Sequence, residues 1–247
     1  MVGGASSLLR TAQRAALSRR GLAFAGLAAI VVAYYALVGH LWEAPLWWDI
    51  AWLDLVQIPA VFLLVWLVLP AWRSRGLIVL AVACGALAFG FHEASAQIPA
   101  NFAKLAAMTF FAWWFLSFFE TLSWVVVVAC IIPFVDAYSV WRGPTNHIVN
   151  HRQALFSTLS FAFPVPGGHG VANLGLPDLL FFALFLAASV RFGLRPLWTW
   201  LGLVISVGAT MALAVAFDVG GLPALPGLSI AFLGINADLI RRRLQHR

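Results

Sequence analysis

Long apolar blocks separated by short polar segments recur along this chain from residue 21 to residue 240. Each block holds about 15 to 20 residues, the length that a helix needs to cross the hydrocarbon of a bilayer. Backbone groups in lipid must be hydrogen-bonded within their own segment, so each block is expected to be a helix. The pattern predicts eight spans, over residues 21–38, 50–69, 76–92, 101–118, 121–140, 174–191, 197–216 and 222–240.

The apolar stretch 101–140 is long enough for two crossings, because a helix rises about 1.5 Å per residue. Polar residues interrupt it near its middle, at Glu120, Thr121 and Ser123. Hydroxyl side chains are favoured where a helix begins. We therefore place a turn here, with one helix on each side.

The composition supports the same fold class. Of the 247 residues, 63% are hydrophobic and 10% are charged, whereas soluble domains carry about 25% charged residues. So few polar residues cannot cover a soluble core of this size. The sequence therefore predicts an all-α polytopic membrane protein with about eight transmembrane helices.

Basic residues indicate the orientation of these helices. With the N-terminus inside, all but three of the 15 lysines and arginines fall in cytoplasmic segments, and the outside receives Lys104, Arg142 and Arg152. This bias predicts that both termini are cytoplasmic. The net charge of +6 then reflects topology and contact with anionic lipid headgroups, not nucleic-acid binding. The preference for arginine over lysine favours a bacterial cytoplasmic membrane.

Two acids, Asp136 and Asp178, fall inside predicted spans, where ionisable side chains are costly and usually functional. Asp54 lies one turn into its helix, where an interfacial acid is ordinary, and Asp238 is expected to pair with the cluster that begins at Arg241. The other acids lie in loops, in the turn or at span edges: Glu43, Asp49, Glu93, Glu120 and Asp218.

Asp136 and Asp178 are predicted to lie at a similar depth. Asp136 follows Glu120 by a rise of about 24 Å, and Asp178 precedes Arg191 by about 20 Å on a helix of opposite direction. Two carboxyl groups close together in a low dielectric cannot both ionise easily, so such a pair shares a proton. That arrangement suits aspartyl-protease chemistry. Two separate acids, each satisfied by water or a hydroxyl, and a proton or ion path are the alternatives.

Three motifs occur in order: "FVDAYSVWRGPTNH" around Asp136, "LGLPD" ending at Asp178, and "GLPALPGLSI" at 221–230. Together they resemble the presenilin and signal-peptide-peptidase family of intramembrane aspartyl proteases. That family has an aspartate in one helix, a Gly-x-Gly-Asp motif at the next, and Pro-Ala-Leu before the last. Pro223 to Leu225 lie about 24 to 27 Å above the inner face, level with both acids.

The resemblance implies a presenilin-like bundle and a hydrolase whose catalytic pair is Asp136 and Asp178, without metal or organic cofactor. On this basis 1–20 is a basic cytoplasmic segment, 21–120 holds N-terminal helices, 121–240 holds the catalytic helices, and 241–247 is a basic tail. Residues expected to shape the site or bind substrate are Gly175, Leu176, Pro177, Pro223, Ala224, Leu225 and Tyr138.

The same resemblance suggests how substrate would bind. The predicted orientation is that of signal peptide peptidase, so substrates would be membrane segments with a cytoplasmic N-terminus, including signal-peptide remnants. Pro223 blocks regular helix at its position and would leave backbone free for substrate. The stretch 154–168 is apolar and β-compatible, and in the family such a segment pairs with unwound substrate as a strand. An interfacial loop is the alternative for this stretch.

Departures from the family pattern keep other functions open. Val135 replaces the tyrosine that usually precedes the first aspartate, Pro177 replaces the second glycine, and eight spans replace nine. A catalytically inactive relative that binds membrane segments is one alternative, and a proton- or cation-coupled transporter is another. His147 and His151 have helical spacing, but without an acid or cysteine nearby they predict solvated loop residues and not a metal site.

Overall fold

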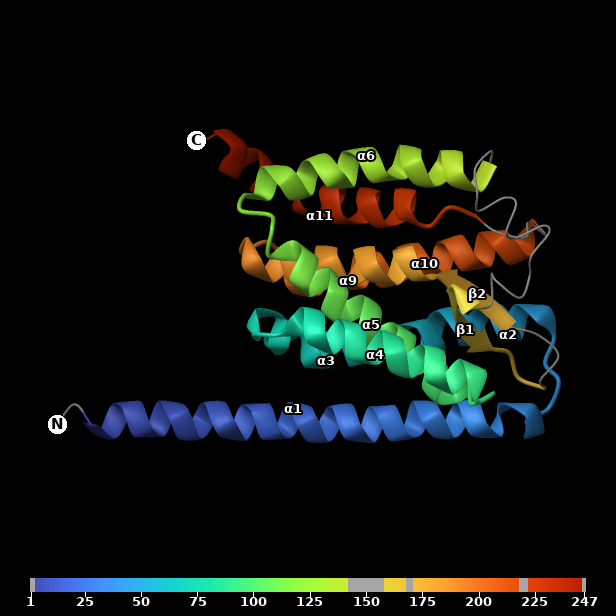
Figure 1. Cartoon of the computed structure of the whole chain (residues 1–247). Helices are drawn as coiled ribbons and strands as arrows, with labels where there is room; N and C mark the ends of the chain where they lie inside the picture. Colours follow the sequence, from blue (N-terminus) through green and yellow to red (C-terminus); the bar gives the residue numbers. More distant parts are fainter. Residues whose placement is uncertain (1–2, 142–157, 168–170, 218–221, 246–247) are drawn as a thin grey trace.

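A computed structural model of the protein describes residues 3–141, 158–167, 171–217 and 222–245. Most of these residues are helical, and the helices run side by side along one direction (Figure 1). The start of α1 and the end of α11 lie at the same end of the bundle, and a strand pair lies toward the opposite end (Figure 1). The helices are α1 (Gly3–Leu37), η1 (Val38–His40), α2 (Leu46–Trp52), η2 (Leu53–Gln57), α3 (Ile58–Val68), η3 (Leu69–Arg73), α4 (Leu77–Glu93), α5 (Gln97–Leu116), α6 (Leu122–Trp141), α9 (Leu176–Arg191), α10 (Pro196–Ala216) and α11 (Leu225–Gln245).

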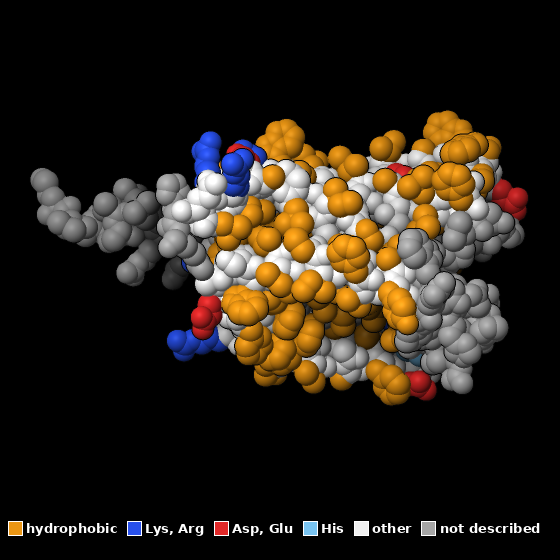
Figure 2. Space-filling view, turned by 90° about the horizontal axis from the view of Figure 1, so that it is seen from above, with side chains coloured by type: hydrophobic (Ala, Val, Ile, Leu, Met, Phe, Trp, Pro, Cys, Tyr) orange, Lys and Arg blue, Asp and Glu red, His pale blue; other side chains and the backbone are white. Residues whose placement is uncertain are grey.

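Four helical segments in the described part of the chain are long and apolar enough to cross a membrane: Ser18–His40, Leu46–Arg73, Leu122–Ser139 and Pro196–Ala214. The face seen in Figure 2 agrees with this, because hydrophobic side chains cover its middle and Lys and Arg gather at one end. The described part of the chain is therefore mostly helical and contains apolar helices of membrane-spanning length, in agreement with the predicted class of membrane protein. The turn near Glu120 is also found, since α5 ends at Leu116 and α6 begins at Leu122.

Helix α9 lies at the centre of the bundle. Its residues from Phe182 to Ser189 are all buried, and a helix that is apolar all round belongs in an interior. Phe182 stacks on Phe62 of α3 with ring centroids 3.8 Å apart, and Phe185 stacks on Phe232 of α11 at 4.7 Å. These contacts fix the helix that begins near Asp178 against both halves of the chain.

Two short strands accompany the helices. Strand β1 (Ser160–Pro164) pairs with β2 (Val171–Gly175) in antiparallel register, with Ser160 opposite Gly175 and Pro164 opposite Val171. β1 lies within the stretch 154–168 that was predicted to be β-compatible. The helix predicted over 174–191 begins two residues later than predicted, at Leu176, because residues 174 and 175 belong to β2.

The second helical run contains a π-helical turn, η2. Pro59, two residues after this turn, lacks the N–H that an α-helix would bond to residue 55 and crowds that carbonyl. A widened turn accommodates such a break, and π turns often occur at functional sites. Asp54 and Gln57 both lie in this turn.

Candidate active site

Asp136 contacts the segment that contains the Pro-Ala-Leu motif. Residues 222–224 are not helical, and α11 begins at Leu225, as Pro223 predicts. The N–H groups of a first helical turn have no acceptor within the helix. The Leu225 N–H instead donates to Oδ2 of Asp136 at 3.1 Å. A carboxylate at a helix N-terminus is favourable on electrostatic grounds as well.

Asp178 lies in the first turn of α9, directly after β2. Its carboxyl group accepts a hydrogen bond from the backbone N–H of Gly175. A Cβ atom at Gly175 would lie only 3.0 Å from Oδ2 of Asp178, so glycine lets the carboxyl group approach the end of the strand. The turn from strand to helix thus supplies both the donor and the space for this acid.

The two acids lie near each other. Asp178 is within range of the charge on Asp136, and helices α6 and α11 pack against each other and against α9. Each carboxyl group is partly buried and accepts one backbone N–H. Two carboxyl groups within electrostatic range of each other in a low dielectric do not both ionise easily.

The other residues predicted for the site divide into two groups. Ala224 and Leu225 are buried at 2% and 3% exposure, and Leu176 packs against the core, so these side chains support the backbone at the acids. Pro223 is partly buried beside them. Pro177 is exposed and occupies the second position of α9. Its missing N–H costs no helical hydrogen bond, because the first N–H groups of a helix have no acceptor within the helix.

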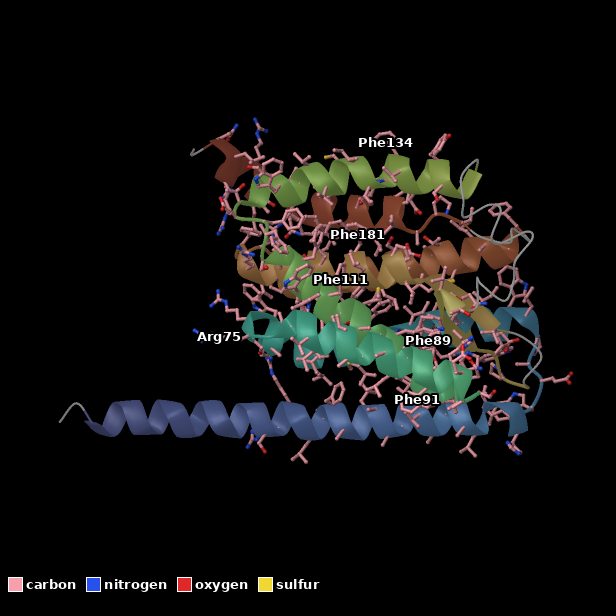
Figure 3. All side chains as sticks on the ribbon, viewed as in Figure 1. Arg75, Phe89, Phe91, Phe111, Phe134 and Phe181 are labelled. Carbon is pink, nitrogen blue, oxygen red and sulfur yellow. The ribbon has the colours of Figure 1, made fainter. Side chains whose placement is uncertain are left out.

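The prediction that Tyr138 shapes the site is not supported by its position. Its side chain is 66% exposed, and two residues along a helix turn a side chain by about 200° from Asp136. Phe134, two residues before Asp136, is likewise exposed and projects outward from α6 (Figure 3). Asp136 therefore occupies the inner face of α6, while Tyr138 faces outward.

Asp54 is a third acid within a helical run, and its surroundings differ from those predicted. Its carboxyl group faces α10, where a Cβ atom at Gly208 would lie 3.3 Å from Oδ1. This oxygen is buried and has no hydrogen-bond partner in the described part of the protein. Asp54 thus differs from an ordinary solvated acid, because one of its carboxyl oxygens is enclosed without a donor among the described residues. The signal available in the sequence was Pro59, which marks the π turn.

Two further expectations need correction. Asp238 pairs with Arg195, at 2.8 Å, and not with the cluster at Arg241, because the loop before α10 brings Arg195 beside the last helix. Lys104 does not face the outside but is buried in α5 and donates to the carbonyl of Ser160. A lone lysine at the edge of an apolar block was the signal for this contact.

Arg142, Arg152 and the histidines at 147 and 151 lie outside the described residues. The chain matches no known family model, no characterised protein and no solved structure in the comparisons made.

Proposed function

We propose that the protein is an intramembrane aspartyl protease of the presenilin and signal-peptide-peptidase type, with Asp136 and Asp178 as its catalytic pair. The observation that carries this proposal is the hydrogen bond from the Leu225 N–H to Asp136, on a carboxyl group within electrostatic range of Asp178. It joins the three motifs that resemble the family, although they come from separate stretches of the chain.

The chemistry would follow from one proton held between the two acids. The ionised carboxylate takes a proton from a water molecule, and the water oxygen attacks the carbonyl carbon of the scissile peptide bond. The protonated carboxyl group donates to the carbonyl oxygen at the same time. The tetrahedral intermediate then collapses and the C–N bond breaks. The leaving nitrogen takes the proton that the first carboxylate had received from water, and a hydroxyl group of the intermediate returns a proton to the second carboxylate as the new carboxyl carbonyl forms.

Substrate backbone would reach this pair along β2. A helical membrane segment hides its carbonyl groups in intrahelical bonds, so it has to unwind before water can attack. An unwound segment can add as a strand to an open sheet edge. The strand β2 runs directly into Gly175 and Asp178, so a segment added there would lie beside the acids.

The proposal includes the predicted topology of eight spans with both termini in the cytoplasm of a bacterial cell. The start of α1 and the end of α11 lie at one end of the bundle (Figure 1), and Arg75 lies at this end too (Figure 3). A shared basic end supports a common cytoplasmic side. Substrates would then enter with a cytoplasmic N-terminus.

The test is cleavage by purified protein in detergent and in vesicles. A model membrane-spanning peptide is incubated with wild type, Asp136→Asn and Asp178→Asn, and products are identified by mass. We expect wild type to cut within the apolar segment and both variants to be inactive. Cleavage that survives either substitution would exclude the proposed pair. A wild type that binds the peptide without cutting it would indicate the inactive relative.

The transport alternative has one observation in its favour, the buried and unpartnered Oδ1 of Asp54. Intramembrane acids of this kind occur in proton and cation pathways. Proton or cation flux in sealed vesicles that is lost in Asp54→Asn, with no peptide cleavage by wild type, would favour transport over proteolysis.

A further inference from the structure

The two strands of the hairpin have different outer edges. In an antiparallel pair, backbone groups point alternately toward the partner strand and away from it. On β1 the carbonyls of Ser160, Ala162 and Pro164 face away from β2, because all three accept hydrogen bonds from helices outside the sheet. This side of β1 is called here its outer edge.

Asn101 of α5 occupies the outer edge at its middle. Its Nδ2 donates to the carbonyl of Ala162 at 2.8 Å, and its Oδ1 accepts from the N–H of the same residue at 2.9 Å. A side-chain amide therefore makes both bonds that a neighbouring strand would make at this residue. No second strand can pair with β1 while Asn101 holds this position.

Four other side chains complete the contacts along this edge. They come from α1, η2 and α5, and with Asn101 they form a set that we name the edge clamp. Their bonds are Lys104 to Ser160 (3.1 Å), Tyr35 to Ala162 (2.9 Å), Tyr34 to Pro164 (3.1 Å) and Gln57 to Pro164 (3.1 Å).

The edge clamp is buried. Gln57 and Asn101 are 5% exposed, and Lys104 is 9% exposed. Buried polar groups lose much more by being left unpaired than exposed ones do, and an ammonium group loses the most. The clamp residues therefore hold β1 in one place, since any shift of the strand would leave several of them without acceptors.

The outer edge of β2 is different. Among the described residues, no hydrogen bond reaches the outward backbone groups of Val171 or Asn173. The side chain of Asn173 lies on the face of the sheet and accepts from Ser160 Oγ at 3.1 Å. The pairing with β1 continues past the strand, where the Leu176 N–H donates to Leu159 at 3.1 Å. Because Leu176 is the first residue of α9, this bond ties the start of α9 to the position of β1.

We propose that the edge clamp is a positioning device for the reaction. It closes β1, which leaves β2 as the edge where a substrate strand adds, and it sets the register of β2 relative to Asp178. The clamp would thus decide which peptide bond of the substrate faces the two acids. This inference rests on the proposed protease function, but it concerns residues far from the reacting atoms in the sequence and held on other helices.

The decisive measurement is the set of cleavage positions. Lys104→Met and Asn101→Leu remove clamp contacts and are compared with wild type by mass analysis of products and by steady-state kinetics. A loosened register should spread cleavage over neighbouring bonds, and kcat should fall about 10- to 100-fold while KM changes less than about threefold. Lys104→Arg retains a donor and should restore most of kcat and the original product set.

Thr109→Val is the matched control. Thr109 is on α5 and is 3% exposed, and its hydroxyl has no partner in the described part of the protein. This control should keep the wild-type products and kcat. The clamp is disproved if Lys104→Met and Asn101→Leu behave as Thr109→Val does. Should a clamp variant fail to fold, as judged by thermal unfolding in detergent, Tyr35→Phe removes a single hydroxyl and takes its place.

A second measurement does not need activity and separates the two proposals. The amides of Phe163 and Leu174, which lie between the strands, should exchange hydrogen faster in Asn101→Leu than in Thr109→Val. Equal exchange overturns the clamp, whether or not the protein cuts peptides. If exchange is faster in Asn101→Leu but the wild-type protein cleaves no peptide, the clamp is supported as a device that holds the strand and the protease function is excluded.

Discussion

Asp178 and Asp54 are both acids in helical, mostly apolar surroundings, but they differ in the hydrogen-bond donors available to them. Asp178 lies where a strand turns into a helix, and the Gly175 N–H donates to it. Asp54 lies inside a continuous helical run, where backbone N–H groups are used within the helix, and its Oδ1 has no partner among the described residues. A break in secondary structure thus provides donors that a continuous helix cannot.

Asp136 shows the same principle from another direction. It lies within a helix, as Asp54 does, but α11 begins opposite it and offers the unused N–H of Leu225. A buried acceptor left without a donor costs about 1–3 kcal/mol. The two acids with backbone donors can exist in a defined protonation state and geometry, which hydrolysis requires. Asp54 lacks this support.

The largest effect on peptide cleavage is expected when each acid is replaced by asparagine in a separate variant. Asp178→Asn should lower kcat/KM on the order of 10³-fold or more, as loss of an essential catalytic group does. Asp54→Asn should leave kcat/KM within about threefold of wild type, because it touches neither acid. Initial rates of peptide cleavage measure both. If both variants were equally inactive, Asp54 would be as necessary for cleavage as Asp178, and the contrast between the two acids would be wrong.

A smaller effect should follow from removing the donor to Asp136. Leu225→Pro deletes the N–H at the first position of α11, where proline fits the helix well. A hydrogen bond to a charged group contributes about 1.5–3 kcal/mol, so cleavage should slow about 10- to 100-fold.

The control for this change is Leu225→Ala, which shortens the same buried side chain and keeps the N–H. Its rate should exceed that of Leu225→Pro, and thermal unfolding in detergent shows what each variant loses in packing. If both variants cleave at the same rate, the hydrogen bond to Asp136 contributes nothing to the reaction.

The space beside Asp178 can be tested in the same way. Gly175→Ala would place a Cβ atom 3.0 Å from Oδ2, so the carboxyl group has to move by a few tenths of an ångström. Displacement of a reacting group on this scale should lower kcat about tenfold. Gly85→Ala in α4 meets no neighbouring atom and should leave kcat unchanged. If Gly175→Ala kept the kcat of wild type, the close approach of the Asp178 carboxyl group to residue 175 would not be needed for cleavage.

The sequence predicted those parts of the structure that depend on local chain properties. Apolar blocks of membrane-spanning length give helices, and Pro223 keeps the segment 222–224 out of regular helix whatever its neighbours are. The convergence at Asp136 and Asp178 was predicted from helix rise alone, since both acids and the Pro-Ala-Leu stretch were assigned one depth. Depth is a property that counting residues can supply.

Features that depend on rotation and on distant neighbours were not predicted. Tyr138 was assigned to the site, but counting along a helix does not show which face meets α11. Lys104 finds its acceptor on β1, and Asp238 finds Arg195 on another loop. Both partners are remote in sequence. The edge clamp belongs to this class too, because its members come from three separate helical elements.

The smallest effect is expected at Asp238, an acid that is partnered but solvated. It accepts two hydrogen bonds from Arg195, each at 2.8 Å, and the two side chains are 46% and 42% exposed. Exposed ion pairs contribute little to stability, so Asp238→Asn should lower the midpoint of thermal unfolding only slightly and leave cleavage unchanged. Salt weakens exposed pairs, and the difference from wild type in thermal unfolding should shrink at high ionic strength. A loss of activity in Asp238→Asn would mean that the contact between Arg195 and α11 affects Leu225 at the other end of α11, and through its N–H the carboxyl group of Asp136 on α6. The acids could then no longer be compared by their local donors alone.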